Sequence, residues 1–362
     1  MGVYKILVPL PTLPIHWGQA PGTEELQAVR QTKKWLQKTE EVMFTACELG
    51  IFDLLTESGE LLASKVIAER LGSSSDGMER MLDTCVSLRL LRMERKNNEA
   101  LYGNTDLSSL YLAKSSPKSQ YPMMKWLSEV IFPSMGYLGD AVREGKNQAD
   151  KIYDHSSNNF FEALYRSEEK KKLFLSTMNT AWSLFGKEVL SAFDLSPFPL
   201  IYDLGGGGGA LAKECASLYP NSTVAVLDLP NVVEAARKLF VSSEEPRITF
   251  HEGDFLKGPI PEADLYILAR TVHHWDDEMC VKLLSKVHKA CKPGGGVLVV
   301  EIVLSEDRSR PLDANLHNLL MLLHTEGKER TLSEYSTLLR AAGFKEIQMK
   351  KRSFYDAVLG RK

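Results

Sequence analysis

Along the first half of the chain, apolar residues recur at the three-to-four-residue spacing of amphipathic helices. The pattern begins after an irregular leader, residues 1–24, and continues through several short helical segments separated by glycines. Two short apolar runs within residues 91–102 then flank a polar turn at 96–99, which predicts a β-hairpin. Three short helices followed by a hairpin predict a winged-helix module over residues 25–118.

A helical, aromatic-rich connector is predicted over residues 119–198, and the pattern changes character from residue 199 to residue 362. In this last part, short apolar runs alternate with helical stretches, which predicts an α/β fold: a Rossmann-like, doubly wound parallel sheet covered by helices. A closing β-hairpin is expected from the two final apolar runs. The expected strands lie at 200–203, 224–228, 248–251, 265–268 and 297–301, and the expected helices near 209–218, 231–240, 277–291 and 333–342.

Composition narrows the class of function. Of 362 residues, 44% are hydrophobic, and the net charge is −3, which argues against a nucleic-acid binder that relies on positive charge. The five cysteines form no CxxC pair, so neither a disulfide framework nor a metal site is indicated. No apolar run is long enough to span a membrane, and the apolar stretch at 4–10 is followed by prolines. We therefore expect a cytoplasmic protein with no membrane partner.

The winged-helix pattern has two interpretations, because such modules often bind DNA. The predicted second and third helices carry few basic residues, and Asp76, Glu79 and Asp83 stand where phosphates would lie. These acids favour a structural or dimerisation role over DNA binding.

The glycine run that follows the first expected strand predicts a ligand site at the carboxyl edge of the sheet. Glycines such as Gly205 and Gly207 let the backbone turn sharply and approach a ligand closely. The pattern Gly205-x-Gly207-x-x-Ala210 also fits a dinucleotide fingerprint, so a dehydrogenase is an alternative.

Acidic residues at three successive strand ends favour S-adenosylmethionine as the cofactor. Asp203, just before the glycines, can meet the ammonium group of a methionine moiety. Asp228 ends the second strand, where an acid can hold both ribose hydroxyls of either cofactor. The sequence Gly253-Asp254-Phe255 ends the third strand and offers a polar edge and an aromatic wall to an adenine. A structural use of all three acids is the remaining alternative.

A candidate general base follows the fourth expected strand. Methylation of a hydroxyl needs a base, and His273 lies at that edge with a side chain that titrates near neutrality. Glu301, at another strand end, and Glu329 are candidates to orient it, and Arg270 can fix a cofactor group or a carboxylate. Alternatively, the segment is a helix N-terminus in which Asp276 and Asp277 are first-turn acids, although that does not explain His273.

Several motifs together resemble class I S-adenosylmethionine-dependent small-molecule O-methyltransferases, and the nearer resemblance is to the acetylserotonin (hydroxyindole) O-methyltransferases of vertebrates. The resemblance runs from about Val42 to the C-terminus. The motifs are Asp203-Leu-Gly-Gly-Gly, Gly253-Asp-Phe, His273-x-Trp275, Lys292-Pro-Gly-Gly-Gly and Glu326-Gly-Lys-Glu-Arg-Thr331.

This resemblance implies a homodimer with interlocked N-terminal helices and an active site to which the connector contributes. It implies His273 as general base held by Glu301 and Glu329, and N-acetylserotonin as the methyl acceptor, with melatonin as product. It implies cofactor contacts at Tyr165, Trp182, Asp228, Gly253, Asp254, Phe255 and Arg270.

The sequence departs from the family pattern at three positions that resemble substrate contacts. His274 stands where the family motif has aspartate, Leu320 where the acetylserotonin enzyme has asparagine, and His324 where it has glutamine. Leucine removes a hydrogen bond worth roughly 0.5–3 kcal/mol to a buried indole or amide group. An enzyme that methylates another hydroxyindole or a phenol, or one with lost activity, is therefore the alternative.

Overall fold

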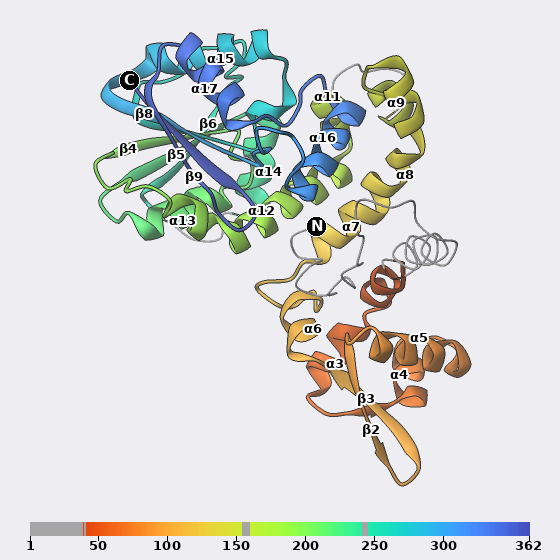
Figure 1. The fold of residues 1–362 in the computed structure, drawn as a ribbon. Coiled ribbons are helices and arrows are strands. Elements are labelled where there is room, and N and C mark those ends of the chain that lie inside the picture. Colours follow the sequence, from red (N-terminus) through yellow and green to blue (C-terminus); the bar gives the residue numbers. More distant parts are fainter. Residues whose placement is uncertain (1–38, 40, 154–159, 241–244) are drawn as a thin grey trace. The chain divides into compact units, whose positions relative to one another are not determined.

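The computed structural model describes residues 39, 41–153, 160–240 and 245–362. The chain divides into two units, Met1–Glu129 and Val130–Lys362 (Figure 1). The expected leader lies outside the described residues. The helical pattern that follows it over residues 25–49 lies mostly outside them as well, but residues 41–48 are helical.

The first unit contains the predicted short helices followed by the predicted hairpin (Figure 1). Asn97 and Asn98 form the turn with positive φ angles of 49° and 66°, a conformation that asparagine tolerates. The apolar pattern over residues 62–71 predicts a helix, but that helix begins only at Ser64, because Leu62 and Ala63 instead pair with the hairpin as β1. The elements are α3 (Ile51–Ser58), β1 (Leu62–Ala63), α4 (Ser64–Arg70), α5 (Ser75–Ser87), β2 (Leu91–Lys96), β3 (Glu99–Asn104), α6 (Asp106–Tyr111) and α7 (Tyr121–Trp126).

The connector is helical, as expected, but broken into short pieces before one long helix. Ser167 caps the long helix α12, because its side chain accepts a hydrogen bond from the backbone of Lys170. The elements are η1 (Leu127–Ile131), α8 (Phe132–Ser134), η2 (Met135–Tyr137), α9 (Leu138–Glu144), α10 (Ala149–Tyr153), α11 (Phe160–Arg166) and α12 (Glu168–Leu190).

A seven-stranded sheet with the order β6-β5-β4-β7-β8-β10-β9 forms the centre of the second unit. Its first five strands are parallel, and the two closing strands are antiparallel, with β10 inserted beside β8. The strands are β4 (Leu200–Leu204), β5 (Thr223–Asp228), β6 (Ile248–Glu252), β7 (Ala263–Ala269), β8 (Cys291–Glu301), β9 (Lys345–Lys350) and β10 (Asp356–Arg361).

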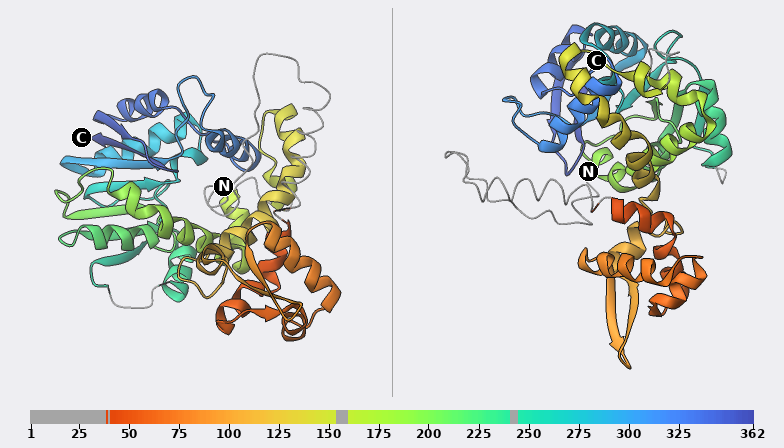
Figure 2. Two further views of the ribbon diagram at one scale, coloured as in Figure 1. Left: turned by 60° about the horizontal axis from the view of Figure 1, so that its bottom comes forward. Right: turned by 90° about the vertical axis from the view of Figure 1, so that its right-hand side faces the viewer.

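Helices cover both faces of this sheet, as the alternating pattern predicts (Figure 2). Successive side chains of a strand point to opposite faces, so Ile201 packs with α12 and α13 while Tyr202 packs with α15 and α17. The helices are α13 (Ala210–Leu218), α14 (Pro230–Leu239), α15 (Asp277–Ala290) and α17 (Leu332–Ala341).

One helix of the second unit was not predicted, α16 (Leu312–His324). Its leucines lie on several sides, so its apolar positions do not form the single stripe by which an amphipathic helix is recognised. Among the described residues, no helix combines the length and the apolar character needed to cross a membrane.

Candidate active site

A cavity of about 560 Å³ opens at the carboxyl ends of β4, β5 and β7. The strand order reverses at β4, which has β5 on one side and β7 on the other, and a crevice forms at such a switch point in open α/β sheets. The glycine loop after β4 forms one wall of this cavity.

The conformation of the loop after β4 explains why it is rich in glycine. Gly205, Gly207 and Gly209 have positive φ angles of 77°, 55° and 78°, which favour glycine. The backbone N–H of Gly207 donates to Asp228 Oδ2 at 2.9 Å. Asp228 Oδ1 accepts a hydrogen bond from the backbone of Leu229 at 2.8 Å. Asp228 thus fixes the loop against the end of β5 and still lines the cavity.

Asp203 lies beneath the glycine loop. A Cβ atom on Gly206 would lie 2.5 Å from Asp203 Oδ2, and this oxygen has no hydrogen-bond partner among the described residues. Burial, and then the charge of Asp228, raises the pKa of Asp203 to about 7. Burial also raises the pKa of Asp228 to about 6. Two carboxyl groups whose pKa values are raised towards neutral pH therefore lie under the loop.

Most of the predicted cofactor residues line this same cavity. Within the described part of the chain, the lining omits Asp203 and Gly253; the backbone N–H of Gly253 instead donates to the carbonyl of Asp228. The predicted residues on the lining are Tyr165, Trp182, Gly205, Gly207, Asp228, Asp254, Phe255 and Arg270.

Sequence reasoning missed the apolar wall that α12 contributes. Phe174 and Met178 line the cavity with Trp182, and the three residues are four apart along the helix. Residues at this spacing share one helix face. Extending the pattern from Trp182 would therefore have found the other two.

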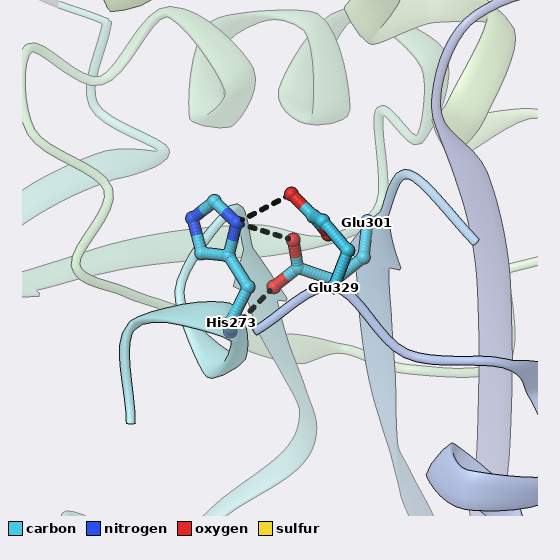
Figure 3. A group of neighbouring side chains, drawn as sticks. All are labelled: His273, Glu301 and Glu329. Atoms are coloured by element: carbon cyan, nitrogen blue, oxygen red, sulfur yellow. Dashed lines mark hydrogen bonds and ion pairs between the residues drawn. The ribbon is translucent and has the colours of Figure 1, made fainter. Parts of the chain in front are cut away.

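His273 is held by two glutamates that arrive from distant segments (Figure 3). Its Nδ1 lies 2.9 Å from Glu329 Oε1 and 3.6 Å from Glu301 Oε2. Glu301 Oε1 also accepts hydrogen bonds from the backbone N–H groups of Thr271, Val272 and His273. The structure thus brings together the three residues that the sequence named as base and orienting partners.

Arg270 completes this buried cluster. Its backbone is left-handed, with φ of 53°, and its Nη1 lies 2.9 Å from both Glu301 Oε2 and Glu329 Oε1. The three ligand atoms of His273, Glu301 and Glu329 lie close enough together to hold a metal ion. The guanidinium already pairs with both carboxylates, so this donor set fits an arginine ion pair.

The surroundings of His273 keep its ring neutral. Burial and the charge of Arg270 lower its pKa well below the usual value. Burial also raises the pKa of Glu301, although Arg270 opposes this. In a neutral ring, the Nδ1–H that donates to Glu329 leaves the lone pair on Nε2, so Nε2 is the basic nitrogen.

Arg330 and Gly327, neither of which sequence reasoning assigned to the site, hold the loop that carries His273. The buried guanidinium of Arg330 donates to the carbonyls of Val272 and Trp275 and to Asp277 Oδ1. A Cβ atom on Gly327 would lie within van der Waals overlap of the His273 carbonyl. Both belong to the motif Glu326-Gly-Lys-Glu-Arg-Thr331, which was the available signal.

The three positions that depart from the family pattern lie in different surroundings. His274 lines the cavity. His324 is buried, with Nε2 3.1 Å from Ser134 Oγ and Nδ1 3.0 Å from Tyr153 Oη. Leu320 is half-buried on α16. The lining of the cavity includes neither Leu320 nor His324 among the described residues, and their contacts with a substrate stay predictions.

Comparison with known proteins adds to this geometry. Residues 135–345 match an O-methyltransferase domain, and residues 38–114 match an O-methyltransferase dimerisation domain. Chicken acetylserotonin O-methyltransferase is 59% identical over 89% of this chain and 93% of its own length. The human enzyme is 48% identical over 94% of this chain and all of its own. The crystal structure of human N-acetylserotonin methyltransferase with SAM superposes with a TM-score of 0.89 and 48% identity, covering 94% and 99% of the two chains.

Proposed function

Because this chain belongs to the O-methyltransferase family, we propose that it transfers a methyl group from S-adenosylmethionine to the hydroxyl of N-acetylserotonin, giving melatonin. The observation that carries this proposal is a neutral, buried His273, oriented by Glu329 next to a glycine-lined cavity.

The residues of the cavity fit the cofactor. Asp228 offers carboxylate oxygens for ribose hydroxyls, and Phe255 and Trp182 offer aromatic walls for apolar and ring surfaces. The unpartnered Oδ2 of Asp203 is buried under the loop, where its negative form favours a nearby ammonium group. When bound, S-adenosylmethionine supplies an electrophilic methyl group on a positively charged sulfur.

His273 acts as the general base of this reaction. Its Nε2 is the basic nitrogen that takes up a proton as the acceptor hydroxyl is deprotonated and its oxygen attacks the methyl carbon. The ring then becomes an imidazolium, which the adjacent carboxylates of Glu329 and Glu301 stabilise. Arg270 keeps both carboxylates in place.

The alternative acceptor is another hydroxyindole or a phenol. It is supported by His324, whose two ring nitrogens are both engaged by Ser134 and Tyr153. A side chain that is satisfied in this way has no donor left for an acetamide group, and Leu320 has none at all.

We further propose that the chain works as a homodimer in the cytoplasm, with its N-terminal helices interlocked. The match to the family's dimerisation domain over 38–114 supports the dimer, and the acids Asp76, Glu79 and Asp83 on α5 favour this role over DNA binding. The five cysteines are all unpaired and buried, as is usual in a reducing compartment.

Calorimetric titration with S-adenosylhomocysteine, followed in the same cell by N-acetylserotonin, tests the proposal. Binding of both compounds, with melatonin detected by mass spectrometry in a parallel turnover assay, is the expected result. Binding of the cofactor product alone would reject N-acetylserotonin as the acceptor and direct the assay to other hydroxyindoles and phenols. Failure of S-adenosylhomocysteine to bind would contradict the methyltransferase proposal itself.

A further inference from the structure

The general base does not itself reach the cavity. His273 is 2% exposed, and the described residues that line the cavity include His274 but not His273. An acceptor bound in the cavity therefore meets the ring of His274 before that of His273.

The two rings are joined by a hydrogen bond whose direction can be deduced. His273 Nδ1 donates to Glu329 Oε1, so His273 Nε2 carries a lone pair. His274 Nε2 lies 3.2 Å from this atom. Two lone pairs cannot form a hydrogen bond, so the proton between the rings belongs to His274 Nε2.

This arrangement leaves one atom without a partner. A neutral His274 with its proton on Nε2 has a lone pair on Nδ1. That atom is buried and has no hydrogen-bond partner among the described residues. Burial, then the charges of His273 and Arg270, lower the pKa of His274 well below its usual value, while Glu329 opposes them. The ring is thus neutral, and its Nδ1 is a buried, unused acceptor atom on a residue that lines the cavity.

We propose that His274 is a catalytic residue that relays the acceptor's proton to His273. The inference rests on the proposed function. The hydroxyl donates its proton to His274 Nδ1 as the Nε2 proton of His274 passes to His273 Nε2. The O–H bond breaks, one N–H bond forms on each histidine, and the original Nε2–H bond of His274 breaks. The oxygen electron pair forms the bond to the methyl carbon, as the bond between that carbon and sulfur breaks. The positive charge comes to rest on His273, beside Glu329.

Aromatic neighbours hold the ring of His274 in place for this transfer. Phe161 packs edge-on against it with ring centroids 4.7 Å apart, and Phe160 stacks at 6.2 Å. A relay needs such a fixed ring, because both of its nitrogens must be in line with a partner.

The substitution His274→Gln tests the relay. A glutamine amide can still donate to His273 Nε2 but cannot accept a proton at one atom and release another. We expect kcat to fall by about 100-fold or more, with unchanged affinity for S-adenosylhomocysteine and little change in the acceptor KM. The exposed histidine of β6 provides the matched control, and His251→Gln should keep the rate of the wild type.

The substitution His274→Asp separates a catalytic role from a structural one. A carboxylate can accept the hydroxyl proton, so this variant should recover at least about tenfold of the rate lost in His274→Gln. A wild-type rate in His274→Gln would overturn the relay while leaving the proposed function intact. Equal loss in both variants would overturn it as well, by assigning His274 a structural role.

Nitrogen NMR of the histidine-labelled protein with S-adenosylhomocysteine provides a readout that does not depend on turnover. The expected tautomers are Nδ1–H for His273 and Nε2–H for His274, with resonances assigned by their loss in His273→Gln and His274→Gln. An Nδ1–H tautomer at His274 would overturn the relay. A wild-type protein that binds the cofactor product but methylates no hydroxyl would contradict the proposed function and the relay together.

Discussion

At the scale of single residues, the carboxyl groups of Asp203 and Asp228 lie at the ends of adjacent strands under the glycine loop. Burial acts on both in the same direction and raises their pKa values to about 7 and about 6. The loop thus covers two carboxyl groups whose charged forms are both disfavoured by burial. A cationic ligand group nearby would favour their charged forms.

The pH dependence of stability follows from this shift. Because the pKa of Asp203 is raised from 3.8 to about 7, the native state binds more protons than the unfolded state between these values. The contribution of Asp203 to the free energy of unfolding is therefore fully present below about pH 4. It is lost as the pH rises through 7, at up to about 1.4 kcal/mol per pH unit.

The variant Asp203→Asn should reveal this loss. Asparagine stays neutral, so the stability of the variant does not fall as that of the wild type does. The free energy of unfolding of the variant, relative to that of the wild type, should therefore increase between pH 5 and pH 8, as measured by denaturant titration without cofactor. A difference that stays constant over this range would mean that Asp203 is already ionised at pH 5 and that its pKa is not raised.

The cluster of His273, Glu301 and Glu329 shows which features of the site could be predicted from the sequence. His273, Glu301 and Glu329 could be named because each lies at a strand end or in a recognisable motif. The sequence did not reveal that Glu329 contacts the ring directly while Glu301 mainly binds the loop backbone. That division depends on distances between segments 28 and 56 residues apart, which no local pattern encodes.

At the scale of elements, the segment before α17 holds the short helix η3 (Val272–His274), which carries His273 and His274. Glu329 binds the ring of His273, and Arg330 binds the carbonyls on either side of the two histidines. Gly327 packs directly against their backbone. Contacts to ring and backbone from a single segment leave the base little freedom to move.

The substitution Gly327→Ala tests whether these contacts hold η3 in place. A methyl group would overlap the carbonyl of His273 and displace η3, so kcat should fall by about tenfold or more. Affinity for S-adenosylhomocysteine should change little, because Gly327 is not on the cavity lining among the described residues. Gly136→Ala is the matched control, since its Cβ atom would meet nothing within 4 Å. Equal kcat in the two variants would argue against a role of this segment in holding η3 in place.

Elements with a clear apolar pattern were predictable, and those whose environment decides their form were not. The strand expected at 224–228 and the helix near 277–291 match β5 and α15 within about one residue, because the first is a continuous apolar run and the second has one apolar face. Leu62 and Ala63 become β1 through pairing with β3, and α16 is apolar on several sides. In both cases tertiary contacts outweigh the local pattern.

At the scale of the whole molecule, the chain combines a unit that matches a dimerisation domain with a unit that carries the cavity and the base. The fold class of both units was predictable from alternation and spacing. The acceptor came only from the family resemblance, because the joint shape of the two segments that carry His274, Leu320 and His324 depends on packing. The contacts of these three residues with a substrate stay predictions.

The proposed dimer has a direct measurement. Light scattering on the purified protein should give twice the 40.5 kDa mass of one chain, and dilution into the nanomolar range should not reduce turnover per chain. A mass of one chain at micromolar concentration, with full activity, would contradict the proposed role of residues 38–114.

The central claim is that His273 is the base, and the variant His273→Ala tests it most directly. Methyl transfer and S-adenosylhomocysteine affinity would be measured on the same preparation of the wild type and the variant. Loss of turnover by about 100-fold or more, with affinity nearly unchanged, is the result that the buried cluster of His273, Glu301 and Glu329 predicts. Turnover at the wild-type rate would contradict the assignment of the base.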